Sequence, residues 1–238
     1  SNAGDLSLQS YGGNVGIGTT NPAEKLDVLG KIAVNGQTAV YIPLGSFTGS
    51  SFYGDGGGSL SYVSGVDGRY NTGVGIGALF SNTTGGYNTA IGYQSLYTNT
   101  EGSYNVASGY QSLRSNTTGT YNIASGHRSL YSNTTGSFNV ASGRESLRYN
   151  TTGGFNIASG YRSLYLNTEG NYNVASGYFA LYANTTGSNN VAIGYRAGRY
   201  IANGSTANQT SGTSVYLGRD TKALADGGNN EIVIGYDA

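Results

Sequence analysis

Tyrosine is the residue type whose spacing in this chain could serve ligand binding. The sequence holds 22 tyrosines. Two series of them recur at multiples of 17 residues, first Tyr93, Tyr110, Tyr161, Tyr178 and Tyr195, then Tyr97, Tyr131, Tyr165 and Tyr182. An aromatic ring with a polar tip can stack on a sugar ring, so these tyrosines are candidate glycan contacts. The competing interpretation is that the rings only pack against one another.

Arginine is the second residue type that suggests a ligand. Six arginines replace Tyr or Gln at varying points of the same pattern: Arg114, Arg128, Arg144, Arg148, Arg162 and Arg196. Guanidinium groups can bind acidic glycans. Single scattered charges on a chain of net charge zero are more commonly solvated, so the sequence by itself favours the solvated interpretation.

Catalytic and metal-binding chemistry finds no support in the sequence. Asp55, Glu145 and Asp220 are isolated, and no base, nucleophile or carboxylate pair recurs at a defined spacing. The chain has no Cys and a single histidine, His127, which leaves no set of ligands for a Cys- or His-based metal site. We therefore expect no enzyme activity, no cofactor and no metal site.

Charge and hydropathy limit the possible partners. The 12 basic residues balance 12 acidic ones, whereas phosphate binding needs clustered Lys and Arg. No apolar run reaches membrane-spanning length, and the residues of this chain contain no signal-peptide pattern. We expect neither a nucleic-acid partner nor membrane contact in this segment.

The tyrosines and arginines named above belong to a repeat of 17 residues, of which residues 88–104 are a representative unit. We number its positions from the leading asparagine. Position 1 is Asn71, Asn88, Asn105, Asn122, Asn139, Asn156, Asn173 and Asn190, and position 5 is Gly75, Gly92, Gly109, Gly126, Gly143, Gly160, Gly177 and Gly194. A fixed period indicates a repeat architecture, in which each unit buries its apolar side chains against its neighbours.

Each unit predicts one short β-strand that ends at a glycine with positive φ. Position 9 is Leu from Leu79 to Leu181, and we expect it to meet the Val or Ile of position 2 across the coil interior. The segment between Gly92 and Asn99 fits an outer strand or a single helical turn, and its Ser-Leu-Tyr sequence, without β-branched residues, favours the helical turn. The following Asn-Thr-Thr-Gly segment predicts a turn. It also matches a glycosylation sequon, but turn structure explains its regular spacing.

Stacked coils place identical residues in columns about 4.8 Å apart. A column of Asn can form a hydrogen-bonded ladder, and the Ala column at position 3 is expected to leave a flat face that another chain can approach closely. About two aliphatic side chains per coil make a thin core against an ordering cost of about 1–2 kcal/mol per residue. We therefore expect an oligomer that associates through the small-residue face, with the number of chains left open.

The chain divides into four parts. Residues 1–3 resemble the remnant of a cleaved tag, so a longer protein is expected. Residues 4–70 form a β connector, with strands expected near residues 14–18, 26–29, 31–34 and 39–42, and its region 34–70 is a linker or small insertion in preference to a ligand site. Residues 71–206 are the array of eight units. After a seven-residue insertion, residues 207–238 continue the pattern in degenerate form at 214–218 and 231–236.

The repeat resembles two groups of fibre proteins. The Asn-Thr-Ala-Ile-Gly and Asn-Val-Ala-Ile-Gly strands at 88–92 and 190–194 resemble the head repeats of trimeric autotransporter adhesins of the YadA-like type. The longer unit, and the segment at 13–33, resemble trimeric surface and tail fibres of bacteria and phages. The resemblance implies an all-β, left-handed parallel β-roll, a homotrimer, an extracellular position on a cell surface or a virion, and a role in adhesion. The longer coil and its tyrosines depart from the shorter head repeat.

Two functions remain open at this stage. One is an adhesive segment that contacts a glycan or protein on a host or prey cell, with many weak and identical sites. The other is a passive spacer shaft whose binding tip lies elsewhere. Repetition favours the spacer for residues 71–206, whereas the irregular stretches 40–70 and 199–213 favour local binding.

Overall fold

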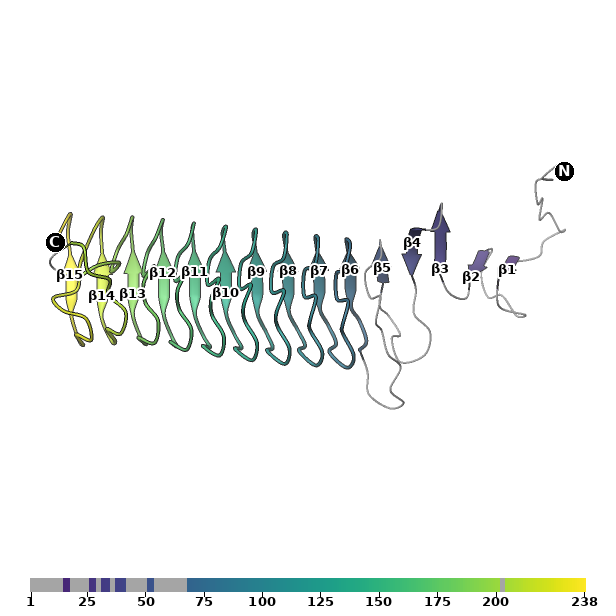
Figure 1. The fold of residues 1–238 in the computed structure, drawn as a ribbon, viewed down its shortest axis with the longest axis horizontal. Helices are drawn as coiled ribbons and strands as arrows, with labels where there is room; N and C mark the ends of the chain where they lie inside the picture. Colours follow the sequence, from purple (N-terminus) through teal and green to yellow (C-terminus); the bar gives the residue numbers. More distant parts are fainter. Residues whose placement is uncertain are drawn as a thin grey trace.

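A computed structural model describes residues 68–201 and 204–238 in full, and five earlier segments as strands. Its regular structure is β-strand throughout (Figure 1). The early strands are β1 (Val15–Ile17), β2 (Leu26–Val28), β3 (Lys31–Val34), β4 (Gln37–Tyr41) and β5 (Ser51–Tyr53). The array strands are β6 (Thr72–Val74), β7 (Thr89–Ile91), β8 (Val106–Ser108), β9 (Ile123–Ser125), β10 (Val140–Ser142), β11 (Ile157–Ser159), β12 (Val174–Ser176), β13 (Val191–Ile193), β14 (Val215–Leu217) and β15 (Ile232–Ile234).

The strands from β6 to β15 form one parallel sheet with one strand in each coil. Ala107 lies beside Ala124, and Ala124 beside Ala141, so that each step of the ladder advances by one repeat of 17 residues. This register confirms the predicted parallel β-solenoid of 17-residue coils. The coils follow one another along a single axis and give the array an elongated shape (Figure 1).

The seven-residue insertion leaves the sheet intact. Val191 pairs with Val215, and Val215 pairs with Ile232 one repeat later. Tyr200 and Ala207 pair in an antiparallel bridge at this point of the chain. β14 and β15 thus lie on the two segments, 214–218 and 231–236, where the repeat was expected to resume.

The N-terminal strands partly follow the sequence prediction. β1 to β4 overlap the four predicted segments. β1 pairs with β2, whereas β3 pairs with β4, and β4 with β5, in antiparallel orientation. β5 was not predicted, and it pairs in parallel with β6. Residues 1–3, and the rest of the connector before residue 68, lie outside the described residues.

The core is built from Ala at position 3 and Leu at position 9. Ala107, Leu113 and their equivalents from Leu79 to Leu181 are fully buried, whereas the position-2 side chains Val106 and Ile123 are more than 40% exposed. The expected contact between position 2 and Leu is therefore wrong. So is the expectation that the Ala column forms an outer face, because that column lies inside the coil.

A buried asparagine explains which side chains of each strand face the core. The position-1 side chain is fully buried, as in Asn105, and it donates through Nδ2 to the backbone oxygen of Gly119 at position 15 of its own coil (2.9 Å). Side chains alternate along a strand. An inward position 1 therefore turns position 3 inward and positions 2 and 4 outward.

Positions 6–11 form an irregular turn, so the preferred helical turn was wrong. Gln111 and Leu113, at positions 7 and 9, adopt left-handed backbone conformations (φ 54° and 48°), and the same holds for their equivalents in other coils. The backbone N–H of Leu113 donates to the oxygen of Ser129 in the next coil (3.0 Å). Hydrogen bonds between coils thus replace those a helix would make within itself, and they offset the cost of left-handed non-glycine residues.

Candidate functional surfaces

Two asparagine ladders hold the coils in register. At position 1, the backbone N–H of Asn122 donates to Oδ1 of Asn105 (2.9 Å). At position 12, Nδ2 of Asn116 donates to Oδ1 of Asn99 (2.8 Å) and to the oxygen of Gly119 (2.9 Å). The predicted ladder is confirmed, and a second ladder at position 12 accompanies it. That position is the sequon asparagine, whose side chain is buried from Asn82 to Asn184, so the turn structure accounts for the motif.

The predicted repeat residues occupy equivalent places in successive coils. Asn88, Asn105, Asn122 and Asn139 are fully buried in the first ladder. Gly92, Gly109, Gly126 and Gly143 follow the strands with φ between 121° and 138°. A Cβ added at Gly109 would lie 2.6 Å from the backbone oxygen of Gly126. Glycine is required there by backbone conformation and by the close approach of the next coil.

The outer side of the parallel sheet, which we call the sheet face, carries exposed apolar and aromatic side chains beside a row of serines at position 4 from Ser108 to Ser176. It comprises positions 17, 2 and 4 of each coil. Its exposed side chains at positions 2 and 4 include Val74, Ile91, Val106, Ile123, Ile157 and Ile193. Beside them runs the aromatic ladder of position 17, formed by Tyr70, Tyr87, Tyr104, Tyr121, Phe138, Phe155 and Tyr172.

The rings of this ladder stack continuously from coil to coil. Centroid distances between neighbours lie between 4.7 Å for Tyr104 and Tyr121 and 5.0 Å for Tyr121 and Phe138, with the planes nearly parallel. This column was not predicted from the sequence. Its signal was the aromatic residue directly before each position-1 asparagine, from Tyr70 to Tyr172.

The position-6 tyrosines lie in a second column. Tyr93, Tyr110, Tyr178 and Tyr195 are exposed, and Tyr161 is half-buried. Tyr93 stacks on Tyr110 and Tyr178 on Tyr195, with centroids 5.2 and 5.3 Å apart, and His127 and Arg144 take the same position between the two groups. Because the rings stack on one another, they offer a ligand mainly their edges and hydroxyl groups.

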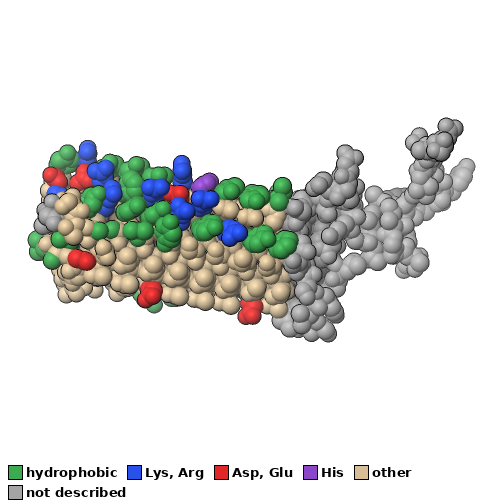
Figure 2. Space-filling model, viewed as in Figure 1, with side chains coloured by type: hydrophobic (Ala, Val, Ile, Leu, Met, Phe, Trp, Pro, Cys, Tyr) green, Lys and Arg blue, Asp and Glu red, His purple; other side chains and the backbone are tan. Residues whose placement is uncertain are grey.

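The arginines that look scattered in the sequence lie together on one side of the solenoid. They occupy positions 6, 7 and 10, and their guanidinium groups lie over aromatic rings of the same columns. Arg128 lies over both Tyr110 and Tyr131 (5.8 and 5.7 Å to the ring centroids), and Arg162 lies over Tyr161 and Tyr165 (5.1 and 4.9 Å). These contacts show that the three columns are neighbours. Figure 2 shows Lys and Arg side chains gathered along one side of the array among hydrophobic ones.

We call this surface the arginine strip. Positions 8 and 9, which lie between its columns in sequence, point into the core opposite the Ala of the strand. The strip and the sheet face therefore lie on opposite sides of the core. The arginines of the strip are Arg114, Arg128, Arg144, Arg148, Arg162, Arg196 and Arg199.

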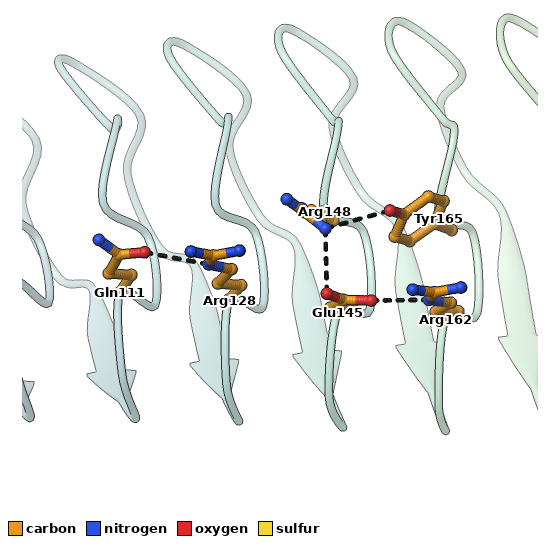
Figure 3. Close-up of polar contacts among 6 residues, drawn as sticks. All are labelled: Gln111, Arg128, Glu145, Arg148, Arg162 and Tyr165. Atoms are coloured by element: carbon orange, nitrogen blue, oxygen red, sulfur yellow. Dashed lines mark hydrogen bonds and ion pairs between the residues drawn. The ribbon is translucent and has the colours of Figure 1, made fainter.

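Glu145 is the carboxylate at the centre of the strip (Figure 3). It is 4% exposed, and it accepts hydrogen bonds from Nε of Arg162 (2.6 Å) and from an Nη of Arg148 (3.0 Å). Burial alone would raise the pKa of Glu145, but the hydrogen bond and charge of Arg162, with the charges of Arg148 and Arg144, outweigh it and lower the pKa below its usual range.

A neutral side chain makes the same contact two coils earlier. Oε1 of Gln111, at the same position 7, accepts from Nε of Arg128 (3.0 Å) (Figure 3). The glutamate is therefore one of two side chains that fit this site. The other carboxylates singled out from the sequence do not join it: Asp220 pairs with Arg219 (3.2 Å), and Asp55 lies outside the described residues.

In the described residues, His, Asp and Glu side chains do not form clusters of three that could hold a metal ion. Likewise, that part of the chain has no helix long and apolar enough to cross a membrane. Comparison of the chain with protein-family models, with curated proteins and with solved structures found no match.

Proposed function

We propose that this chain is a segment of an extracellular trimeric fibre, on a cell surface or a virion, that attaches to a target cell through many weak and identical contacts. The proposal rests on the resemblance of its repeats to trimeric fibre proteins and on one structural observation, the exposed apolar sheet face. A protein that stays monomeric rarely leaves so long a row of apolar and aromatic side chains in water.

Another copy of the same chain suits this face. The apolar columns repeat at the coil spacing, with ring centroids 4.7–5.0 Å apart along the aromatic ladder. A parallel second copy has the same repeat and brings equivalent columns into contact over the whole length of the array. Rotational symmetry closes such a contact into a ring of copies, and the resemblance sets their number at three.

The mass of the particle in solution tests the assembly. Light scattering should give about three times the 24.5 kDa of one chain. A matched variant combines Ile123→Thr with Ile157→Thr, since Thr72 and Thr89 occupy the same position in other coils. It should dissociate at concentrations where the parent chain stays assembled. A one-chain or two-chain mass for the parent would contradict the trimer.

Attachment is tested on a glycan array read with the assembled protein and with the dissociated variant. Multivalent contact predicts that binding falls by orders of magnitude on dissociation, because linked sites act at a high effective concentration. Equal binding by a folded single chain would instead indicate a discrete high-affinity pocket.

The second candidate function is a passive spacer shaft with a binding tip elsewhere. The Asn-Thr-Thr-Gly turns form one edge of the solenoid, which we call the turn edge. Its uniformity favours the spacer, because the same hydrogen bond recurs there from coil to coil. Oγ1 of Thr117 donates to the oxygen of Thr134 (3.0 Å), and Oγ1 of Thr134 to that of Thr151 (3.1 Å). A trimer that binds neither glycans nor intact target cells would support the spacer.

A further inference from the structure

We propose that the arginine strip binds a linear acidic polysaccharide that runs along the fibre axis and places its carboxylate or sulfate groups on successive guanidinium groups. This inference rests on the proposed function, since it names the class of ligand through which the fibre attaches.

The first argument is the separation of charge around the solenoid. Between residues 71 and 201 the chain carries seven arginines and three carboxylates. All seven arginines belong to the strip, but only Glu145 among the carboxylates does. Glu101 and Glu169 stand exposed at position 14, on the threonine turn. A chain of net charge zero thus carries a strongly positive surface along one side.

The second argument is that most of these arginines have no carboxylate partner. Arg148 and Arg162 share Glu145. The other five, Arg114, Arg128, Arg144, Arg196 and Arg199, form no ion pair with any carboxylate in residues 68–201 or 204–238. Their charge remains available to an external anion.

The third argument is that the guanidinium groups are already held in place. Arg114 lies over Tyr97 (5.2 Å to the ring centroid), and Arg199 lies over Phe179 and Tyr182 (4.5 and 4.8 Å). Stacking on rings fixes the planar group, so less conformational freedom is lost when an anion binds. The arginines recur over most successive coils from Arg114 to Arg199, in three neighbouring columns that run along the array. This arrangement suits an extended polymer with repeated charges.

The stacking also selects among polyanions. Proteins that bind single-stranded nucleic acids offer open ring faces on which bases stack. In the strip, those faces are covered by neighbouring rings or by guanidinium groups, as for Tyr165 between Tyr182 (5.1 Å) and Arg162. The exposed surface that remains consists of guanidinium charge, ring edges and hydroxyl groups. These suit a polysaccharide better than a nucleic-acid base.

Two single substitutions distinguish the effect of charge in the strip from the effect of the net charge of the chain. Glu145→Gln should preserve the fold, because Gln111 makes the equivalent bond to Arg128, and it removes the carboxylate that competes with the ligand. Glu169→Gln changes the net charge equally, but on the turn edge. Binding of the assembled protein to immobilised heparin in low salt should tighten about threefold per chain for E145Q and stay nearly unchanged for E169Q.

A second pair of substitutions removes charge from the strip. Arg128→Gln and Arg144→Tyr each introduce the residue found at the same position in other coils, Gln111 and Tyr110. Together they should weaken heparin binding about tenfold and lessen its dependence on salt, because fewer counterions are exchanged. Circular dichroism and light scattering establish that each variant is folded and assembled.

Three outcomes would overturn the inference. They are equal tightening by E145Q and E169Q, unchanged binding by the double arginine variant, and binding of oligo-dT as tight as that of heparin or polygalacturonate. If any of these occurs while the trimer still binds target cells, the proposed function stands and only the ligand assignment fails. Loss of assembly or of cell attachment would instead contradict the proposed function itself.

Discussion

Gly198 and Tyr216 share one volume of the core in adjacent coils. Gly198 stands at position 9, where other coils carry Leu, and Tyr216 stands on β14 beside Ala192, at the Ala position. The Tyr216 ring is fully buried. A Cβ at residue 198 would lie 2.7 Å from Cδ2 of Tyr216 and 2.9 Å from a methyl carbon of Leu181. The large and small residues have exchanged places between strand and turn.

This exchange predicts strong coupling between the two residues. Gly198→Leu alone should destabilise the fold by about 1–3 kcal/mol through overpacking, and Tyr216→Ala by about 3–5 kcal/mol through the cavity it leaves. The double variant restores the pattern of the other coils and should cost much less than the sum. Denaturant unfolding at one fixed protein concentration measures the cycle. Simply additive costs would show that the two side chains do not share space.

The second asparagine ladder predicts a large effect for a small side chain. Asn116→Ala removes the donor to Oδ1 of Asn99 and the acceptor for Nδ2 of Asn133 (2.8 and 2.7 Å). Unsatisfied buried groups should cost about 1–3 kcal/mol in unfolding free energy. Thr118→Ala, on the exposed turn of the same coil, is the control and should stay within about 0.5 kcal/mol. Similar values for both variants would argue against an energetic role for the ladder.

The glycine after each strand predicts intolerance to a single methyl group. Gly109→Ala meets the oxygen of Gly126 at 2.6 Å and requires alanine at φ 138°, so a loss of about 3 kcal/mol or more is expected. Gly154→Ser should be far milder, because Ser103 and Ser137 occupy the same position in other coils. The midpoint of thermal unfolding compares the two. A well-tolerated Gly109→Ala would mean that the coils can separate locally at little cost.

The lowered pKa of Glu145 predicts that acid removes the contribution of this carboxylate to the stability of the fold. Its pKa in the folded chain lies below the value of about 4.3 expected for an unfolded chain. The carboxylate therefore stabilises the folded state at pH above the unfolded value, and this contribution is lost as the pH falls through the folded value. The stability difference between the parent and Glu145→Gln should shrink over that range, while Glu169→Gln should follow the parent. Parallel pH profiles for the parent and Glu145→Gln would contradict this account.

Much of the fold follows from the sequence because the repeat carries its own register. Asn105 and Asn122 lie one repeat apart, and stacking of equivalent residues leads directly to the ladder that the structure contains. The glycine at position 5 predicted the end of each strand, since few other residues adopt its φ. The parallel solenoid with 17-residue coils could thus be inferred without coordinates.

Tertiary structure decided which side chains face inward and where the charged residues gather. The period places Val106, Ala107 and Leu113 in separate columns, but the bond from Asn105 to Gly119 determines that Ala107 is buried and Val106 exposed. Residues with left-handed backbone conformations, such as Leu113, are stabilised by hydrogen bonds to the next coil. The local conformational preference of the residue does not predict such a conformation. The turn that these residues form brings positions 6, 7 and 10 to one side, so arginines that look scattered in sequence share a surface. Sequence alone determined the period because it is a property of spacing, whereas the faces depended on tertiary contacts within and between coils.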